Sequence, residues 1–342
     1  MRSDNNSGVS EAILKAIINE NEGNVIAYGG DELTHKTEQR FKEVFENDGL
    51  KSYNLVSGTA VNSLIVATLS PTFGAIFCHK NSHINTDECG SIEFQTGGAK
   101  LIPLAGINGK ITPSEVEGAI ETFIIGEAHH NQPSMLSIAQ TTEVGTVYTP
   151  EEINDLSTLL KKYGLKLHMD GARFANALDK IGCSPAEMTW KSGVDALSFG
   201  TTKNGTLGAE VAIFFNDTDD GSFIYRRMRS GNLISKMRFI SAQIMAYLEN
   251  DLWLDNAKHS NAMAVKLYDA LKDNQNIEFS MPVQSNMMFV VMDEVLKDKL
   301  WQAGFRFYSY TAAGKIEHRL VTSFNTQPEK IERFIEIVKN HS

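Results

Sequence analysis

The sequence predicts an α/β protein in which a large domain, with a mostly parallel central sheet flanked by helices, precedes a smaller α+β C-terminal domain. Short apolar runs typical of buried strands alternate with helix-like segments, a pattern typical of a parallel sheet covered on both faces. The length of 342 residues also favours a second core over a single one. We place an N-terminal arm and helix at residues 1–22, the large domain at 23–254 and the small domain at 255–342.

Composition narrows the class of partner. A net charge of -10 and a pI near 5.4 disfavour nucleic-acid backbones and anionic membranes, which repel an acidic surface. Cys78, Cys89 and Cys183 are odd in number, far apart and without metal-ligand spacing, so we expect reduced thiols, a cytoplasmic location and no metal site. No apolar run has the length or position of a membrane span or a secretion signal, so we expect neither.

The first part of the chain holds one turn of possible chemical interest. A polar arm and a short helix fill the first 22 residues, and the loop at Tyr28 precedes a helix expected over residues 33–47. A strand at 53–56 then runs into Ser57-Gly58-Thr59-Ala60, which begins a helix that ends before Pro71. Small residues at a helix N-terminus let a phosphate approach free amides, although many such turns bind none.

Histidines follow the next strand, expected at residues 75–78. His79 and His83 both lie in the loop after it, and nothing local ranks one above the other. A strand at 101–104 and a helix at 113–121 come next. The pair His129-His130 has no recognisable third ligand, and adjacent side chains point apart in regular structure, so we read it as surface.

Three further strands carry the strongest signals. A strand expected at 135–142 ends in Glu143, and a helix over 151–163 leads to a strand that ends in Asp170. The apolar run 196–199 then leads through small and hydroxyl residues to Lys203, after which glycines allow a turn. A lysine that follows a core strand should be buried, and burial lowers the pKa of an amine and favours its nucleophilic form.

Lys203 and Asp170 together indicate pyridoxal phosphate (PLP). At neighbouring strand ends, the lysine would form a Schiff base with the cofactor and the aspartate would hold its pyridinium nitrogen. Ligands of parallel sheets bind beyond the carboxyl ends of the strands, where the turns at Ser57, His83 and Glu143 should also converge.

The rest of the chain completes the two domains. We expect a strand at 209–215, a basic helix at 223–229 and a long helical stretch over 239–271. Strands at 285–292, at 306–310 and around Arg319, and a closing helix at 328–338, should form the small domain. Most arginines of the basic helix should face solvent, and Arg229 is our choice among Arg226, Arg227, Arg229 and Lys236 for a phosphate contact.

The ordered motifs resemble a known family. Asp170-Gly171-Ala172-Arg173, then Ser198-Phe199, then Thr202-Lys203-Asn204-Gly205 resemble the low-specificity L-threonine aldolases, which belong to the β-eliminating lyase/threonine aldolase group of fold type I PLP-dependent enzymes. The resemblance extends from Arg2-Ser3-Asp4 to Arg319-Leu320-Val321-Thr322. It implies aldol cleavage of L-threonine or L-allo-threonine to glycine and acetaldehyde, and a homotetramer built as a dimer of dimers.

The resemblance also implies roles for individual residues. His83 would stack on the cofactor ring, Ser3 would lie near the substrate carboxylate, and Tyr28 would lie near the cofactor of a neighbouring subunit. Arg319 and Arg173 would hold the substrate carboxylate, a task suited to planar guanidinium groups. The expected cofactor contacts come from Ser57, Gly58, Thr59, Ala60, His83, Asp170, Arg173, Thr202, Lys203 and Arg229.

Several alternatives stay open. Many members of the family have a histidine where this chain has Glu143, so the base that acts on the substrate hydroxyl is Glu143, His83 or an ordered water. The same cofactor frame also serves β-elimination and transamination. A protein of this fold that binds a ligand without turnover is a third reading, in which Lys203 is structural.

Overall fold

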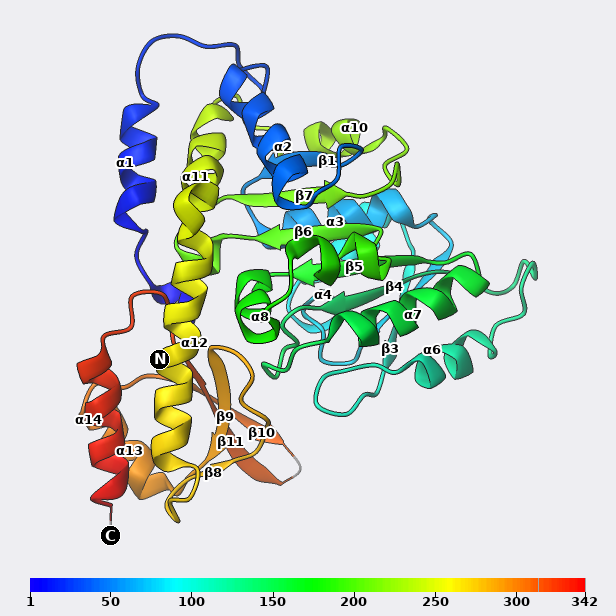
Figure 1. The fold of residues 1–342 in the computed structure, drawn as a ribbon. Helices are drawn as coiled ribbons and strands as arrows, with labels where there is room; N and C mark the ends of the chain where they lie inside the picture. Colours follow the sequence, from blue (N-terminus) through cyan, green and yellow to red (C-terminus); the bar gives the residue numbers. More distant parts are fainter. Residues whose placement is uncertain (313, 342) are drawn as a thin grey trace.

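In the computed structural model, which describes residues 1–312 and 314–341, the chain forms two sheets (Figure 1). The larger sheet has seven strands in the order β1-β7-β6-β5-β4-β2-β3, and the smaller has four in the order β10-β11-β9-β8. The strands of the larger sheet are β1 Lys51–Leu55, β2 Gly74–His79, β3 Lys100–Leu104, β4 Gln132–Ala139, β5 Lys166–Gly171, β6 Ala196–Gly200 and β7 Glu210–Phe214. Those of the smaller sheet are β8 Glu278–Phe279, β9 Met287–Val291, β10 Tyr308–Ala312 and β11 Lys315–Val321.

The prediction of a mostly parallel large sheet is confirmed. β3, β2, β4, β5 and β6 pair in parallel, and only β7 in this sheet runs opposite to its neighbours β6 and β1. Strands β2, β6 and β7 are buried along their whole length. Such strands read as continuous apolar runs because both faces of the sheet are covered.

Helices cover both faces of the large sheet and one side of the small sheet (Figure 1). The helices are α1 Glu11–Asn19, α2 Glu32–Val44, α3 Gly58–Leu69, α4 His83–Thr86, α5 Ser91–Thr96, α6 Pro113–Ile120, α7 Pro150–Lys162, α8 Phe174–Ile181, α9 Pro185–Met188, α10 Phe223–Arg229, α11 Arg238–Leu248, α12 Leu252–Leu271, α13 Glu294–Gln302 and α14 Pro328–Lys339. Short 3-10 turns lie at η1 Asp4–Asn6, η2 Trp190–Ser192, η3 Thr202–Asn204 and η4 Glu249–Asp251. The core on one face includes side chains of α2, α7, α8 and α11, and the cores on the other face include those of α3, α5 and α10.

The strand that leads to Lys203 is anchored by an aromatic cluster around Phe199 of β6. Its ring contacts Phe41 edge-on at 5.3 Å between centroids, and Trp253 lies 5.7 Å away. Phe174 and Tyr247 also lie within reach of the ring, at 5.9 and 6.2 Å. Removing a buried phenylalanine ring typically costs about 3–5 kcal/mol of stability, so this cluster fixes the end of β6 firmly.

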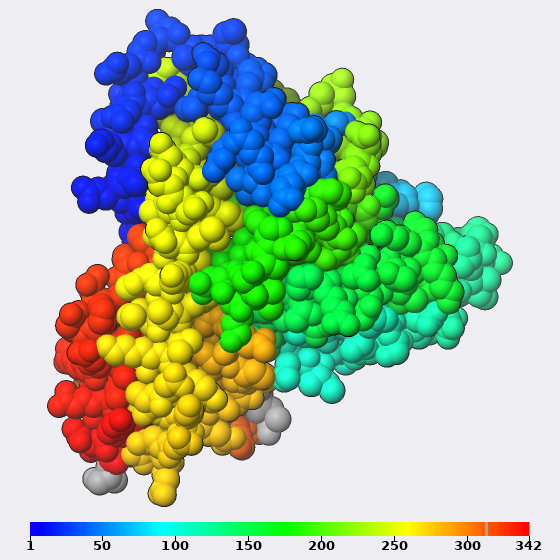
Figure 2. All heavy atoms as spheres, in the orientation of Figure 1, coloured from blue at the N-terminus to red at the C-terminus, as the bar shows by residue number. Residues whose placement is uncertain are grey.

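The helix α12 belongs to both cores. Trp253 near its start packs in the core of the large sheet, whereas Ala264, Leu267 and Leu271 pack with the small sheet and α14. The boundary that we placed near Asp255 therefore falls inside a continuous helix. In the space-filling view this helix runs between the red C-terminal residues and the green residues of the large sheet (Figure 2).

The long helical stretch expected over 239–271 is interrupted, which corrects the prediction. Asn250 and Asp251 have left-handed backbones, with φ of 49° and 56°, and separate α11 from α12. Asparagine and aspartate adopt this conformation more readily than other residues that carry a side chain. The strand expected over 135–142 also ends early, at Ala139. The side chain of the next residue, Gln140, donates to the carbonyl of Tyr148 (2.8 Å) and accepts its backbone amide (3.0 Å).

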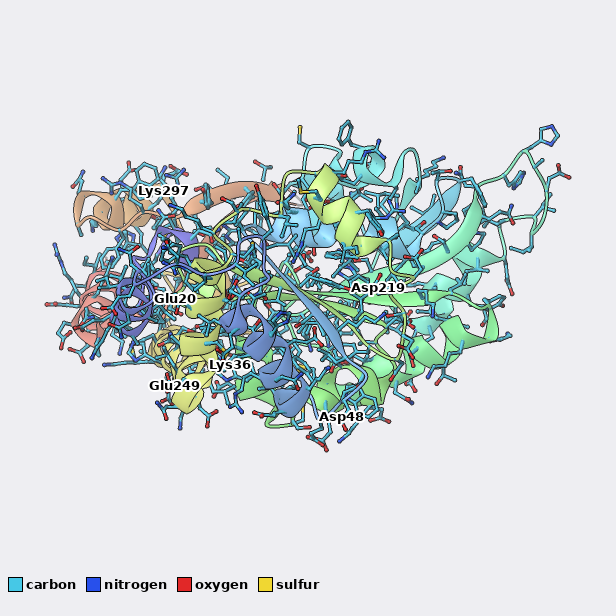
Figure 3. The ribbon with its side chains drawn as sticks, turned by 90° about the horizontal axis from the view of Figure 1, so that it is seen from above. Glu20, Lys36, Asp48, Asp219, Glu249 and Lys297 are labelled. Carbon is cyan, nitrogen blue, oxygen red and sulfur yellow. The ribbon has the colours of Figure 1, made fainter. Side chains whose placement is uncertain are left out.

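The surface agrees with the acidic composition. Charged side chains such as Lys36, Asp48 and Glu249 lie exposed on the outside of the molecule (Figure 3). Among the described residues, no helix combines the length and the apolar character that crossing a bilayer requires.

Candidate active site

One edge of the large sheet collects the predicted site residues. β1, β2, β4, β5 and β6 run in the same direction, so their carboxyl ends lie along one edge. The residues that follow or end these strands are Ser57, His83, Glu143, Asp170 and Lys203. The topology therefore brings together turns that are up to 146 residues apart in the sequence.

The backbone of the Lys203 turn is held from two sides. The buried carboxylate of Glu210 on β7 accepts the backbone amides of Thr201 (3.1 Å) and Thr202 (3.4 Å). On the other side, the Nδ2 atom of Asn204 donates to the Tyr247 hydroxyl (2.7 Å) and to the carbonyl of Trp253 (2.8 Å). These contacts fix the backbone from which the lysine side chain projects.

The Lys203 amine has no ion pair or hydrogen bond with another residue in the described part of the chain. Burial lowers its pKa, and the nearby positive charge of Arg173 lowers it further. The charges of Asp4 and Asp170 oppose that effect. Asp4 begins η1, which packs against the η3 turn that carries Lys203. A lysine with a lowered pKa has a larger neutral fraction, and the neutral amine is the nucleophile.

Asp170 is held through both of its carboxylate oxygens. Oδ1 accepts the backbone amide of Ala172 (3.0 Å), and Oδ2 accepts Nδ2 of Asn62 (2.8 Å). The pairing of β5 with β6 aligns Asp170 with Ser198, so the aspartate lies one strand away from the Lys203 turn. Two donors and a buried position keep this carboxylate in one orientation.

His83, and not His79, faces the other site residues. It begins α4, and its Nδ1 lies 2.8 Å from Oε1 of Glu88. The hydrogen bond with Glu88 raises the pKa of His83, and the charge of Asp170 adds to the rise. His79 instead contacts the carbonyl of Gly106 (3.4 Å) and accepts the backbone amide of Asn81 (3.2 Å).

Glu143 packs directly against the His83 segment. Its Oε1 accepts the backbone amide of His83 (3.0 Å), while its Oε2 is buried without a partner among the described residues. Burial raises the pKa of Glu143 to about 7. A carboxyl group with such a pKa exchanges its proton near neutral pH, which is what a general base requires.

Arg173 binds a carboxylate of the chain itself. Its Nε and Nη2 donate to the two oxygens of Asp4 at 2.7 and 2.9 Å, and Nδ2 of Asn286 donates to the same carboxylate at 3.1 Å. The Asp4 side chain is almost completely buried, and the neighbouring Arg173 holds its pKa below the usual range despite that burial. We had expected Arg173 to hold a substrate carboxylate; this ion pair already occupies two of its three nitrogens.

Arg319 lies on β11 of the small sheet, beside the N-terminal arm. Its guanidinium stands 5.0 Å from the ring centre of Tyr308, and Arg2 stacks on the same ring at 4.5 Å. The Nε of Arg319 is buried and has no partner among the residues described. Arg319 therefore still has a free donor for a substrate carboxylate, whereas most donors of Arg173 are occupied by Asp4.

The N-terminus of α3 is open to an anion. Ser57 caps the helix by accepting the amide of Ala60 (3.3 Å), whereas Ser57 and Gly58 are exposed and Thr59 is half-buried. A Cβ atom built on Gly58 would meet nothing within 4 Å. The free amides of a 12-residue helix thus face unfilled space.

The basic helix α10 directs Arg227, rather than Arg229, toward the end of β1. Arg229 is exposed, and no hydrogen bond or ion pair of its side chain is found in the described chain. Arg227 is buried, its Nη1 donates to the carbonyl of Asn54 (3.3 Å), and its guanidinium lies 5.6 Å from the ring centre of Tyr53. Its Nε has no partner among the described residues, so Arg227 is the buried cation nearest to the strand that leads to Ser57.

Three other predicted residues lie at the margin. Ser3 is half-buried beside Asp4 and caps η1 by accepting the amide of Asn5 (3.2 Å). Thr202 is half-buried in the lysine turn, where its hydroxyl donates to the carbonyl of Ala209 (3.4 Å). Tyr28 is exposed in the loop before α2 and makes none of the site contacts described above.

Sequence reasoning did not select four carboxylate and amide residues that the structure places in the site. They are Asp4, Asn62, Glu88 and Glu210. Two of them carry a signal, because Asn62 interrupts an apolar helix and Glu210 begins an otherwise apolar strand. Asp4 and Glu88 sit in polar segments, where an acidic residue attracts no attention.

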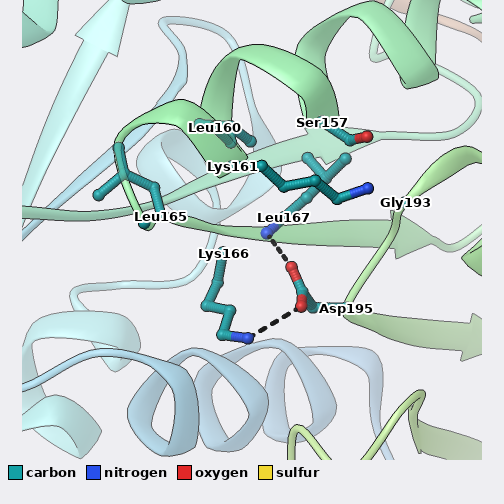
Figure 4. Close-up of a pocket in the computed structure, with 9 residues that line it drawn as sticks. Ser157, Leu160, Lys161, Leu165, Lys166, Leu167, Gly193 and Asp195 are labelled. Atoms are coloured by element: carbon teal, nitrogen blue, oxygen red, sulfur yellow. Dashed lines mark hydrogen bonds and ion pairs between the residues drawn. The ribbon is translucent and has the colours of Figure 1, made fainter.

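A separate surface pocket lies at the opposite ends of the strands. It has a volume of about 270 Å³, and its lining includes Lys161, Lys166 and Asp195 (Figure 4). Asp195 accepts both the Lys166 amine (3.1 Å) and the backbone amide of Leu167 (2.8 Å). These polar groups satisfy one another, so the pocket adds nothing to the site at the other edge.

Comparison with known proteins gives a consistent result. The profile of the Beta-eliminating lyase family matches residues 1–294. The low specificity L-threonine aldolase of Pseudomonas sp. (strain NCIMB 10558) is 39% identical over 330 residues, which cover 96% of this chain and 94% of that protein. The enzyme of the same name from Pseudomonas aeruginosa is 38% identical over 329 residues, with 96% and 94% covered.

Solved structures agree with the fold. A structure of Leishmania major threonine aldolase superposes with a TM-score of 0.91 at 27% identity and covers 99% of this chain and 98% of that one. A serine palmitoyltransferase from Sphingomonas wittichii superposes with a TM-score of 0.72 at 14% identity, covering 96% and 83%. The second likeness shows the fold alone.

Proposed function

The chain belongs to the β-eliminating lyase family, and on this premise we propose that it is an aldolase that uses PLP to cleave β-hydroxy-α-amino acids, such as L-threonine or L-allo-threonine, into glycine and an aldehyde. The observation that carries the proposal is the half-buried Lys203, whose pKa burial lowers, in the turn after the strand that pairs with the strand of Asp170. Two relatives with 38–39% identity over nearly the whole chain are named as L-threonine aldolases, which supports the same reaction here.

The residues of the site fit this cofactor. A phosphate group suits the open amides of Gly58 and Thr59, and Arg227 supplies a buried positive charge on the same side of the sheet. Lys203 supplies the amine for covalent attachment, Asp170 the carboxylate for the ring nitrogen, and His83 a flat ring for stacking. Several buried polar atoms of these residues have no hydrogen-bond partner in the described chain, as expected where a polar ligand binds. They include Asn62 Oδ1, Glu143 Oε2, Arg227 Nε and Arg319 Nε.

Orientation of the substrate is the first task of the protein residues. Bound PLP supplies an electron sink for the pair released when the Cα–Cβ bond breaks. Arg319 binds the substrate carboxylate, and Arg173 assists through the nitrogen that Asp4 leaves free. A fixed carboxylate would limit which bond to Cα can be broken, and this choice would separate aldol cleavage from elimination and transamination.

Removal of the proton from the β-hydroxyl is the second task. Glu143 has a buried oxygen without a partner, and burial places its pKa near neutrality. A group of this kind accepts a proton at Oε2 and returns it in a later step. His83 and an ordered water are the rival bases.

Cofactor trapping tests the proposal directly. The purified chain with added PLP should be yellow, and borohydride reduction should leave a phosphopyridoxyl adduct on Lys203 that peptide mass spectrometry locates. L-threonine or L-allo-threonine should then yield acetaldehyde and glycine, whereas 2-oxobutanoate and ammonia would indicate elimination. A colourless protein with no adduct on Lys203 would contradict the proposal.

Two substitutions sharpen that test. Lys203→Ala should abolish turnover because the covalent anchor and the nucleophile are both lost. Asp170→Ala should reduce turnover severely, since the ring nitrogen would lose the carboxylate that keeps it protonated. Near-normal rates in either variant would show that the site is elsewhere.

Assembly and location stay part of the proposal. A homotetramer would bring Tyr28 of one subunit near the cofactor of another, and the exposed position of this side chain suits such a contact. The free cysteines suit the cytoplasm. The roles of Ser3, Ser57, Ala60, Thr202 and Arg229 as contacts of cofactor or substrate remain predictions.

A further inference from the structure

Glu88 is a buried carboxylate to which the proposed reaction gives no role. It lies in the turn between α4 and α5, and its side chain is completely inaccessible. The next two residues, Cys89 and Gly90, have left-handed backbones with φ of 51° and 72°. A non-glycine residue with positive φ is uncommon, so the turn adopts a sparsely populated geometry that directs Glu88 inward.

Three polar side chains converge on this carboxylate. Its Oε1 is 2.8 Å from Nδ1 of His83 and 2.8 Å from Nδ2 of Asn62, and the Ser91 hydroxyl donates to Oε2 at 3.1 Å. When His83 carries a proton on Nδ1, all three contacts donate to Glu88, and both of its oxygens have a partner.

Asn62 connects Glu88 with Asp170. The Nδ2 group of Asn62 donates one hydrogen to Glu88 and the other to Asp170, both at 2.8 Å. Two buried carboxylates therefore share one uncharged amide group. His83 is the only basic side chain within ion-pair distance of Glu88 in the described chain, so it is the group that can place a positive charge directly against this carboxylate.

The groups around His83 agree on the sign of this effect. Glu88 and Asp170 favour the charged imidazole, while burial and the Lys203 amine oppose it, and the pKa of His83 is raised overall. Glu143 contacts the same residue from the loop after β4, but through the backbone amide. The imidazole is still partly accessible, with 43% of its side chain exposed, so it can contact a ligand.

We infer that Glu88 is a positioning residue that fixes the ring orientation of His83 and holds it as an imidazolium, so that His83 serves the site as a hydrogen-bond donor and Glu143 accepts the β-hydroxyl proton. The second half of this inference rests on the proposed aldol cleavage, and the first half does not. In chemical terms, His83 already carries its second proton before substrate arrives. Glu143, with one donor on Oε1 and none on Oε2 among the described residues, has room for a proton.

The titration of His83 is the direct test. Diethylpyrocarbonate acylates neutral imidazole only, so the pH dependence of its rate at each histidine, read by peptide mass spectrometry on the full chain without cofactor, gives the midpoint of that histidine. We expect the midpoint of His83 to lie above that of His35, which is exposed and has no side-chain hydrogen bond or ion pair among the described residues. A midpoint at or below that of His35 would overturn the inference without any variant.

Matched variants then identify Glu88 as the cause. Glu88→Gln should lower the His83 midpoint by about one pH unit or more, because a partner charge within ~4–6 Å shifts a pKa by roughly 1–3 units. Asp87→Asn removes the same charge from the exposed neighbouring residue and should leave the midpoint unchanged. Glu88→Asp keeps the charge and should recover part of the shift, and it serves if Glu88→Gln fails to fold. Equal midpoints in the wild type, Glu88→Gln and Glu88→Asp would overturn the role of Glu88.

The pH dependence of kcat/KM tests the second half on the PLP-loaded enzyme. Activity should rise as the pH increases through about 7, because the carboxylate form of Glu143 is the active one. Glu88→Gln should lower the rate but keep this acid limb, whereas the limb would move with the His83 midpoint if His83 were the base. If no β-hydroxy amino acid is cleaved, the proposed function fails, while the chemical titration of His83 still decides the role of Glu88.

Discussion

The loops after β2 and β4 each present one glutamate to His83, and the two glutamates differ in every contact. Glu88, after β2, contacts the imidazole side chain and accepts hydrogen bonds from Asn62 and Ser91. Glu143, after β4, meets the backbone amide and leaves one buried oxygen without a partner among the described residues. Both loops follow strands that pair with each other in parallel, so they enter the site from adjacent positions.

The difference lies in the polar partners of each carboxylate. Glu88 has a partner on both oxygens. Glu143 has one partner on Oε1 and none on Oε2 among the described residues, and burial raises its pKa to about 7. One glutamate is therefore suited to hold a neighbour in place, and the other to exchange a proton.

The largest expected effect comes from Glu143→Gln. The amide cannot accept the hydroxyl proton, so kcat/KM for L-threonine should fall by about 10²–10⁴, the usual contribution of a general base. The acid limb near pH 7 should disappear in the same variant. Glu151→Gln, an exposed site at the start of α7, is the control. Unchanged activity in Glu143→Gln would show that Glu143 is not the base and would leave His83 or an ordered water in that role.

A smaller effect should follow from Asn62→Ala. This change removes the amide that separates Glu88 from Asp170 and leaves each carboxylate short of one donor. Loss of a donor to buried charged groups should cost about 1–3 kcal/mol of unfolding free energy, measured by urea denaturation. Asn85→Ala, in an exposed position of α4, provides the comparison. An unfolding free energy equal to that of the wild type would show that the shared amide does not stabilise the pair.

The smallest effect should come from Ser91→Ala. It removes one neutral donor from Oε2 of Glu88 while the contacts with His83 and Asn62 remain. We expect a loss of about 1 kcal/mol or less in unfolding free energy and a small decrease in the His83 midpoint. A loss of unfolding free energy larger than that of Asn62→Ala would contradict the expectation that Ser91 stabilises Glu88 less than Asn62 does.

The sequence allowed the frame of the site to be predicted, but not its supporting contacts. Lys203 and Asp170 stand at the ends of apolar strands, and this local signal together with alternating strands and helices was enough to predict the sheet and the neighbouring positions. Asn62 reaches Asp170 across 108 residues, and Asp4 reaches Arg173 across 169. No local pattern encodes such pairs, since they depend on the order of strands in the finished sheet.

Local chemistry was ambiguous in two places. Arg229 has the same charge as Arg227 and lies two positions away on α10, but the turn of the helix buries only Arg227. The helical periodicity over 239–271 continued through Asn250 and Asp251, where the backbone turns left-handed. In both cases the residue type was compatible with either outcome, and tertiary packing decided between them.

The ion pair of Asp4 has a consequence for the order of folding. Its partners Arg173 and Asn286 lie 169 and 282 residues further along the chain, and loops of such length close late. Arg173 becomes available with the large sheet, whereas Asn286 leaves the ribosome more than a hundred residues later. The carboxylate of Asp4 therefore gains its last partner only after the strands that carry the lysine turn have been made.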